Sequence, residues 1–368
     1  MRWPTTLALA ALLPLALAGC AADDAAPTPA RTPGGAASDS PASDSSASDS
    51  ATAQPNTKPT RALLDWNDTG VEVGTRYVRG PEWEALVNTQ GTTIELSRDG
   101  DAVTIAAGSG RTISEVLMSE TWAVVVKQDR AERSPSQAVA VDLETGEQRG
   151  LVSPEPASGG SWALSGGDLY YPTYGEDRAY CLATAALADG NGEDGWCAQP
   201  RTGWSGLTAS DNGVALMTFD DARPVACRTV HLLDASGLPQ PLDGPSDCLA
   251  WDVAATADGA VWSEVPKPRR QEEATFHARV DGALLDLGPG TTGSAVPCGD
   301  SVFFVRDPQT PDDPARLMRW TPQHTLEIAY ESASRGNAFL GEPVCGGGVL
   351  TLSSFGDTGD EQVWASVS

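Results

Sequence analysis

The sequence predicts an all-β protein, a seven-bladed β-propeller built of four-stranded antiparallel blades. Short runs rich in Val, Leu, Tyr and Trp alternate with Gly, Pro and Asp turns, and no segment has a helical period. A turn motif also recurs. It is clearest at Thr256–Trp262, where one apolar run ends, an acidic Gly-containing turn follows and the next apolar run begins. The regular spacing of these turns is the third observation.

The turns recur at the spacing of propeller blades. The first apolar residue after each turn is Trp122, Leu169, Val214, Val261, Val302 and Val349. Neighbouring positions are 47, 45, 47, 41 and 47 residues apart. A period of about 40–50 residues in a β-rich sequence is typical of propellers. With an earlier blade expected in Val71–Ala107, these six repeats predict seven blades. Six blades, with the N-terminal part packed differently, are the alternative.

The last repeat contains only three apolar runs, so its sheet would keep an open edge, which promotes aggregation. Ala62–Trp66 is a spare apolar run before the first blade. We expect it to supply the missing strand and close the ring. The repeat length and the Asp-Gly turns resemble those of WD-repeat and TolB-type propellers. The regular Trp-Asp signature is absent, so the resemblance implies architecture and no functional residue.

The N-terminus predicts export and lipidation. Arg2 precedes the apolar stretch Leu7–Ala18, which is too short to span a bilayer as a helix. Leu17-Ala18-Gly19-Cys20 resembles the lipobox of bacterial lipoproteins. The resemblance implies that residues 1–19 are a signal peptide and that Cys20 is acylated. Each buried CH2 of the acyl chains contributes about 0.8 kcal/mol, so the protein would be held on the extracytoplasmic face of the cell membrane.

Residues 20–60 are predicted to be a disordered tether, because they are rich in Ser, Ala, Asp and Pro and have no apolar period. Residues 61–368 then form one propeller domain. The net charge of −26 repels nucleic acid, which is not expected as a partner, and favours cations or basic partners; the alternative is that the charge only keeps the protein soluble or reflects a host bias toward acidic proteins. We expect a monomer. No phosphate loop, nucleophile elbow or metalloprotease motif occurs, so no cofactor and no catalytic residue are predicted.

Six cysteines follow Cys20, and an even number in an exported protein indicates disulfides. Their positions relative to the repeats predict three bonds, which are Cys181–Cys197, Cys227–Cys248 and Cys298–Cys345. The first pair flanks a hairpin and the second joins consecutive repeats. The third occupies the same turn position in two successive repeats.

Trp162, Trp204 and Trp251 each precede an innermost strand, as does Phe339. In a propeller, the innermost strands all begin on one face, here called the start face, together with the loops between second and third strands. The three indoles could therefore surround the channel there and form a ligand platform. The alternative is that they pack between blades.

The segment Asp189–Gly195 has alternating oxygen-bearing residues, so Asp189, Asn191 and Glu193 are weak calcium candidates. It departs from the EF-hand pattern at Asp194 and Pro200, and a plain turn is the other interpretation. No other metal site is expected.

Two functions remain open. The absence of catalytic motifs favours a non-enzymatic module that binds a protein, peptide or glycan outside the membrane. The alternative is an enzyme that acts on a polysaccharide through carboxylates at the channel mouth. A calcium-stabilised structural module is a third interpretation.

Overall fold

The computed structural model describes residues 57–151, 153–222, 226–267 and 270–367. They belong to one compact unit, Ala51–Ser368. The predicted signal peptide, Cys20 and nearly all of the tether lie outside the described residues. Within the described ranges, no helix has the length and apolar character needed to cross a bilayer.

Four sheets are blades of four antiparallel strands in chain order. The first contains β3 (Tyr77–Arg79), β4 (Glu84–Val87), β5 (Thr93–Arg98) and β6 (Asp101–Ala106). The second contains β11 (Ala163–Ser165), β12 (Asp168–Tyr174), β13 (Tyr180–Ala186) and β14 (Asn191–Cys197). The third contains β15 (Thr202–Ser210), β16 (Gly213–Asp220), β17 (Cys227–Leu233) and β18 (Pro239–Pro241). The fourth contains β19 (Ala250–Thr256), β20 (Gly259–Glu264), β21 (Thr275–Val280) and β22 (Ala283–Pro289).

The fifth blade gains a strand from the N-terminal part of the domain. Its antiparallel strands are β23 (Val296–Cys298), β24 (Ser301–Arg306), β25 (Pro314–Trp320) and β26 (Leu326–Arg335). The short β1 (Thr60–Arg61) pairs in parallel with β26 at its outer edge. Two 3-10 turns, η1 (Glu176–Arg178) and η2 (Gln271–Glu273), lie in loops between second and third strands.

The remaining strands form one nine-stranded sheet. One part contains β7 (Arg111–Met118), β8 (Trp122–Asp129), β9 (Gln137–Asp142) and β10 (Gln148–Gly150). The other contains β28 (Val344–Gly346), β29 (Val349–Gly356), β30 (Glu361–Ser366), β2 (Asn67–Asp68) and β27 (Ala338–Leu340), which pairs beside β29. The two parts join where β28 pairs in parallel with β7 at Gly346 and Met118.

The predicted blade number is therefore wrong, for seven and for six alike. Five sheets are discrete blades, and the other phased repeats share the nine-stranded sheet. The physical reason lies in the Gly346-Gly347-Gly348 turn. A Cβ on Gly347 would lie 2.8 Å from the Glu120 nitrogen, so only glycine lets the backbone of the turn approach the β7–β8 turn this closely. The sequence pattern identified the turn but not this contact.

The predicted closing strand is also corrected. Ala62–Trp66 is not a strand, and the backbone N–H groups of Ala62 and Leu64 donate to carbonyls of β26 instead. The residues that cover the edge of β30 are Asn67 and Asp68 in β2. A segment before the first blade does meet the last strands, as expected, but it contacts two sheets in succession.

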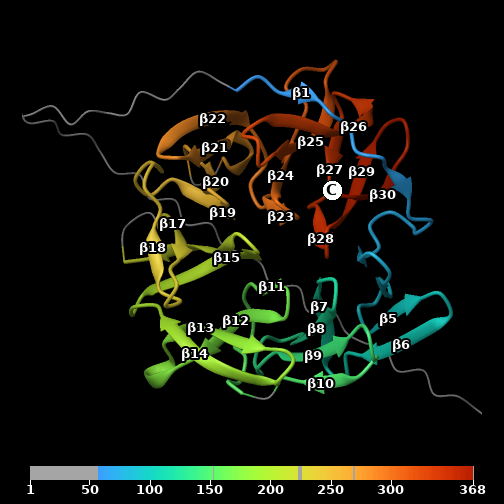
Figure 1. Cartoon of the computed structure of the whole chain (residues 1–368), viewed down its shortest axis with the longest axis vertical. Coiled ribbons are helices and arrows are strands. Elements are labelled where there is room, and N and C mark those ends of the chain that lie inside the picture. The colour runs from blue at the N-terminus through green and yellow to red at the C-terminus, as the bar shows by residue number, and fades with distance from the viewer. Residues whose placement is uncertain (1–56, 152, 223–225, 268–269, 368) are drawn as a thin grey trace, which may run out of the picture. The chain divides into compact units, whose positions relative to one another are not determined.

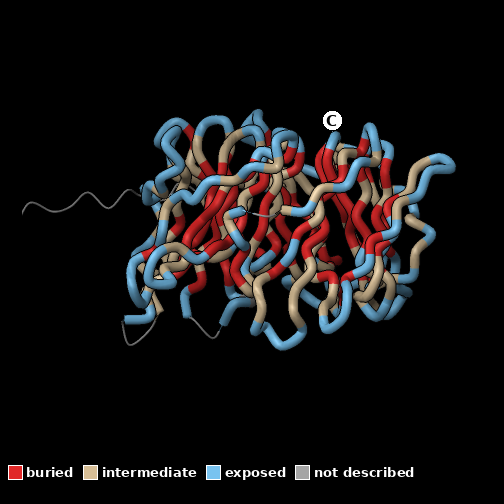
Figure 2. Tube along the Cα trace, turned by 90° about the horizontal axis from the view of Figure 1, so that it is seen from below, coloured by how far each residue is buried: buried red, intermediate tan, exposed pale blue. Residues whose placement is uncertain are grey.

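The inner strands contact one another in order around the ring, and β28 returns to β3 (Figure 1). The buried residues occupy the middle of the strands, whereas the loops at both faces are exposed (Figure 2). The apolar core is divided into clusters that each span neighbouring sheets. For example, one joins Phe276 of β21 to Phe304 of β24, whose rings stack 4.1 Å apart. Each sheet is thus stabilised by burial against both neighbours.

All three predicted disulfides are confirmed. Cys181–Cys197 links β13 to β14 within a blade. Cys227–Cys248 links β17 to the segment that leads into β19. Cys298–Cys345 links the inner strands β23 and β28 across two sheets. The position of each cysteine within its repeat was sufficient to predict the pairs. In each pair, the two cysteines lie at the same end of neighbouring strands.

Candidate functional site: the start-face channel mouth

Irregular inner strands build the channel mouth at the start face. The register shifts between Ile113 and Glu115 in β7, and between Ala250 and Val253 in β19. A third shift interrupts β15. A β-bulge leaves a residue unpaired and redirects the neighbouring side chains. Glu115 directly follows one bulge and Asp252 lies within another, so both carboxylates leave the regular alternation of their strands.

Glu115 is partly buried, and no described residue hydrogen-bonds to its carboxyl group. Loss of water around the group is the main effect and raises the pKa of Glu115 to about 8. The charge of Glu342 raises it further, and Arg76 opposes the shift. The guanidinium of Arg76 is held by the Ile113 carbonyl, 2.5 Å from Nη1. Glu115 is therefore largely protonated at neutral pH.

The carboxylate of Asp252, unlike that of Glu115, accepts hydrogen bonds from described residues. Its Oδ1 accepts a hydrogen bond from the Gly293 backbone N–H at 2.8 Å, and its Oδ2 accepts one from the Ser263 hydroxyl at 2.5 Å. Burial nevertheless raises the pKa of Asp252 to about 6, against the opposing effect of these two hydrogen bonds. The charge of Glu342 adds to the increase. Asp252 is thus mostly ionised at neutral pH, while Glu115 is not.

Glu342 connects the two carboxylates. It lies between β27 and β28, and its charge acts on both Glu115 and Asp252, although β7 and β19 belong to sheets that are not neighbours. Glu342 is therefore within electrostatic reach of both carboxyl groups, although the three are not grouped closely enough to form a metal site among the described residues. Crowding by protein atoms raises the pKa of Glu342, but its side chain is exposed and water moderates the effect. Glu115 and Asp252 are the strongly shifted members.

A partly exposed aromatic pair lies close to Glu342 along the chain. Phe339 of β27 is 54% exposed and its ring stacks on Phe355, with centroids 4.7 Å apart. Only two residues separate Phe339 from Glu342. Carboxylates beside an aromatic face are suited to a ligand that carries both a cationic and an apolar part. Among the described residues, no three acidic, histidine or cysteine side chains are grouped as a metal site would require.

The predicted tryptophan platform is placed mostly inside the protein. Trp162 and Trp204 are 4% and 2% exposed. Trp162 stacks on Tyr171 at 5.2 Å, and Trp204 packs against Tyr180 at 5.1 Å. Tyr171 belongs to the same blade as Trp162. Tyr180 belongs to the blade before that of Trp204, so Trp204 packs between blades as the alternative interpretation expected. Both rings therefore offer little surface to a ligand. Trp251 is partly exposed, but Arg228 covers its ring, with its guanidinium carbon 4.3 Å from the centroid.

The weak calcium candidates lie far along the sheet from this mouth. Asp189 is in the turn before β14, and Asn191 and Glu193 are exposed residues of β14 itself. As strand residues, Asn191 and Glu193 share a regular antiparallel ladder with β13. A loop that wraps a cation is therefore not formed by these three residues in the structure.

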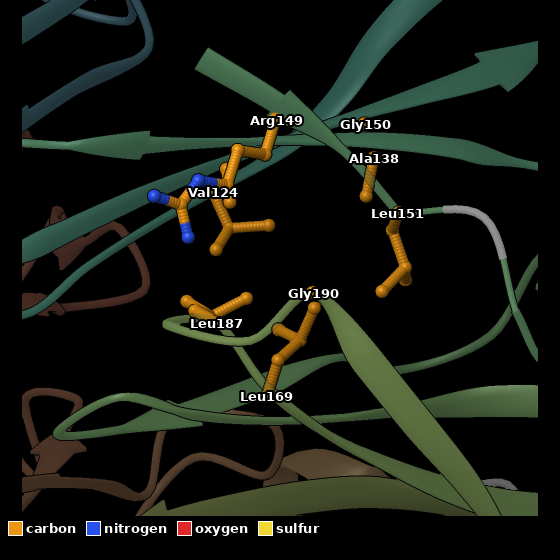
Figure 3. A pocket seen from close by; sticks show the side chains of 9 residues that line it. Val124, Ala138, Arg149, Gly150, Leu151, Leu169, Leu187 and Gly190 are labelled. Carbon is orange, nitrogen blue, oxygen red and sulfur yellow. The ribbon is translucent and has the colours of Figure 1, made fainter. Parts of the chain in front are cut away.

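A gap between the blade of β11–β14 and the nine-stranded sheet is lined mainly by apolar side chains, with Arg149 as its one charged lining residue (Figure 3). Its volume is about 10 Å³, room for a single water molecule. Val124, Leu151, Leu169 and Leu187 face it (Figure 3). It is a packing space between sheets rather than a binding site.

The comparisons with known proteins show the β-propeller fold. The β-propeller domain of the Trilobed protease from Pyrococcus furiosus is 10% identical, with a TM-score of 0.55 over 80% of this chain and 94% of that one. A prolyl endopeptidase structure is 13% identical, with a TM-score of 0.55 over 82% of this chain and 47% of that one. TolB from Acinetobacter baumannii is 10% identical over 80% of this chain and 79% of that one, and its TM-score of 0.42 supports no conclusion.

This chain therefore spans about half the length of the prolyl endopeptidase that it resembles. No family model matches the chain. No curated protein matches it either.

Sequence reasoning missed Glu115, Asp252 and Glu342. It anticipated carboxylates at the channel mouth but could not select them among the 50 acidic residues. The available signal was an acidic residue within a predicted inner strand, at Asp252. That signal is weak, because the direction of the Asp252 side chain depends on the bulge. The regular in-and-out alternation of a predicted strand does not reveal a bulge.

Proposed function

We propose that this chain is a lipid-anchored lipoprotein on the extracytoplasmic face of the membrane, and that its propeller is a binding module. Among the protein, peptide and glycan ligands expected from the sequence, the structure favours a basic peptide or a basic segment of a protein. The observation that supports this choice is the poorly hydrated carboxyl group of Glu115, together with the effect of the Glu342 charge on both Glu115 and Asp252. A basic segment with several cationic side chains would compensate the negative charge of these groups.

The pH dependence of binding follows from this chemistry. A cation stabilises the ionised form of each carboxyl group, so it can pair fully only after Asp252 and Glu115 have lost their protons. Affinity for a lysine side chain, which stays charged, should therefore rise between about pH 5 and pH 8. Nonspecific attraction to the net charge would change little across this range, because most surface carboxylates are already ionised.

The test is isothermal titration calorimetry, in which an oligolysine peptide is titrated into the full-length chain. The triple variant Glu115→Gln, Asp252→Asn, Glu342→Gln should weaken binding by about tenfold or more, since hydrogen bonds to charged groups contribute roughly 1.5–3 kcal/mol each. The matched control, Glu95→Gln, Glu144→Gln, Asp168→Asn, replaces the same numbers of Glu and Asp residues at exposed positions outside this mouth. Equal weakening by both variants would contradict a specific site.

The anchor has a separate test. Cys20 lies outside the described residues, and the proposal depends on its place in the lipobox-like Leu17–Cys20 segment. Cells expressing the chain should incorporate labelled palmitate into it, and Cys20→Ser should abolish the label and release the protein from the membrane fraction. Unchanged membrane attachment of Cys20→Ser would contradict lipidation at this residue.

A second candidate function is an enzyme that cleaves a polysaccharide. The observation that favours it is the separation of two carboxyl pKa values, with Glu115 at about 8 and Asp252 at about 6. At neutral pH such a pair supplies one protonated acid and one ionised base, as glycoside hydrolysis requires. Release of reducing sugar by the wild type and not by Glu115→Gln would establish this activity. Equal release by both proteins would exclude Glu115 as the acid.

A further inference from the structure

The opposite face of the propeller carries a hollow of about 200 Å³, here called the end-face hollow. The turns between the first and second strands of three consecutive sheets form one wall, through Asn212, Asp258 and Asp300. Trp320 and His324, at the β25–β26 turn, form the other. The hollow is smaller than typical sites for drug-sized ligands, which measure about 300–1,000 Å³, so it would hold a single small group.

One polar group in this hollow has no partner within the protein. Trp320 is only 2% exposed and lines the hollow, yet no described residue accepts a hydrogen bond from its indole N–H. The indole nitrogen is not among the fully enclosed unpartnered polar atoms of the described residues, so the small exposed part of Trp320 includes this N–H. The stacked ring of His324, 6.3 Å from the indole by centroid, covers one face of Trp320. A ligand would therefore approach the edge of the indole and not that face.

The other groups are mainly acceptors. Asp258 Oδ2 is paired with His324 Nε2 at 2.9 Å, so one carboxylate oxygen of Asp258 remains for a ligand. Asp300 is exposed and has no hydrogen bond or ion pair with any described residue. The amide of Asn212 both donates and accepts. The hollow thus requires a ligand with several donors and at least one acceptor for the indole N–H.

We propose that the end-face hollow binds one ring of a sugar. Each hydroxyl group donates one hydrogen bond and accepts others, so a polyhydroxylated ring can satisfy the carboxylates and the indole N–H together. A simple ammonium group would satisfy the carboxylates but has no acceptor for Trp320. This site does not rest on the proposed function, because it lies where the inner strands end and not where they begin.

The experiment uses the full-length chain and a panel of methyl glycosides of glucose, galactose, mannose, arabinose and N-acetylglucosamine, with tetramethylammonium as the cationic comparison. Binding is measured by calorimetry and by saturation-transfer NMR. At least one glycoside should bind. Asp300→Asn should weaken that binding about tenfold or more, because it removes a charge-assisted hydrogen bond without disturbing any protein contact.

Asp168→Asn is the matched control, since Asp168 is an exposed acid at the β11–β12 turn of another blade, outside the hollow. It should leave glycoside binding unchanged. Trp320→Phe keeps an aromatic ring but removes the N–H, and it should also weaken binding when its melting temperature shows that it folds. Absence of binding by every glycoside, binding of tetramethylammonium alone, or equal binding by wild type and Asp300→Asn would each overturn the proposal.

Discussion

The two ends of the channel are built differently. At the start face, bulged inner strands bring Glu115 and Asp252 into poorly hydrated positions. At the end face, regular turns carry the acids, and Asp258 is paired with His324 in solvent. The comparison shows that the repeated turns and the interruptions of the strand pairing have different effects on the acidic side chains. The repeated turns give an exposed polar rim, whereas breaks in the strand pairing give buried carboxyl groups with shifted pKa values.

The largest expected effect on the free energy of unfolding comes from removing the disulfide Cys298–Cys345, which links two inner strands at the end face. Replacing Cys298 and Cys345 by Ser should lower the free energy of unfolding by about 2–4 kcal/mol, because the bond closes a 47-residue separation. The same change at Cys181 and Cys197, separated by 16 residues, should cost about 1 kcal/mol less. Urea denaturation checks both values, and the reverse order would contradict this account.

The next effect sharpens the description of the start-face mouth. Asp252→Ala should reduce the free energy of unfolding by about 1–3 kcal/mol, because it leaves the Gly293 N–H and the Ser263 hydroxyl without their acceptor. Asp252→Asn retains an acceptor oxygen and should cost less. Equal stability of Asp252→Ala and wild type in urea denaturation would show that the two hydrogen bonds are not important.

A smaller effect is the response of stability to pH. The pKa of Glu115 is raised on folding, so the folded state binds more protons than the unfolded state between about pH 4.5 and pH 8. Stability from this group is therefore lost as the pH rises through that range. Glu115→Gln should melt higher than wild type at pH 8, by about 2 °C or more, and similarly to it at pH 5. A constant difference at both pH values would contradict the assignment.

The smallest effect is expected at the end face. Asp258 and His324 are both exposed, with side-chain exposures of 42% and 37%. Exposed ion pairs contribute about 0–1 kcal/mol, so His324→Ala should change the free energy of unfolding by less than about 1 kcal/mol. A loss as large as that of Asp252→Ala would remove the distinction between the two ends of the channel. The measurement is again urea denaturation at neutral pH.

The sequence predicted what depends on repetition. Its period identified the propeller, the repeated turns that precede Val214, Val261 and Val302, and all three disulfides. It did not predict the approach of Gly347 to the β7–β8 turn, since glycines in a turn motif do not reveal which backbone lies beside them. Glu115 and Asp252 were missed for a related reason. A bulge is a change in the backbone hydrogen bonding between two strands. It does not alter the sequence period from which the strands were predicted.

The most direct test is the ionisation of Glu115 itself. The full-length chain can be labelled with ¹³C at glutamate carboxyl groups, and the Glu115 resonance assigned by its loss in Glu115→Gln. A titration by NMR should give Glu115 a pKa near 8, well above that of the exposed glutamates. A midpoint near the ordinary value of about 4.3 would show a hydrated carboxylate and would contradict the proposed cation-binding mouth.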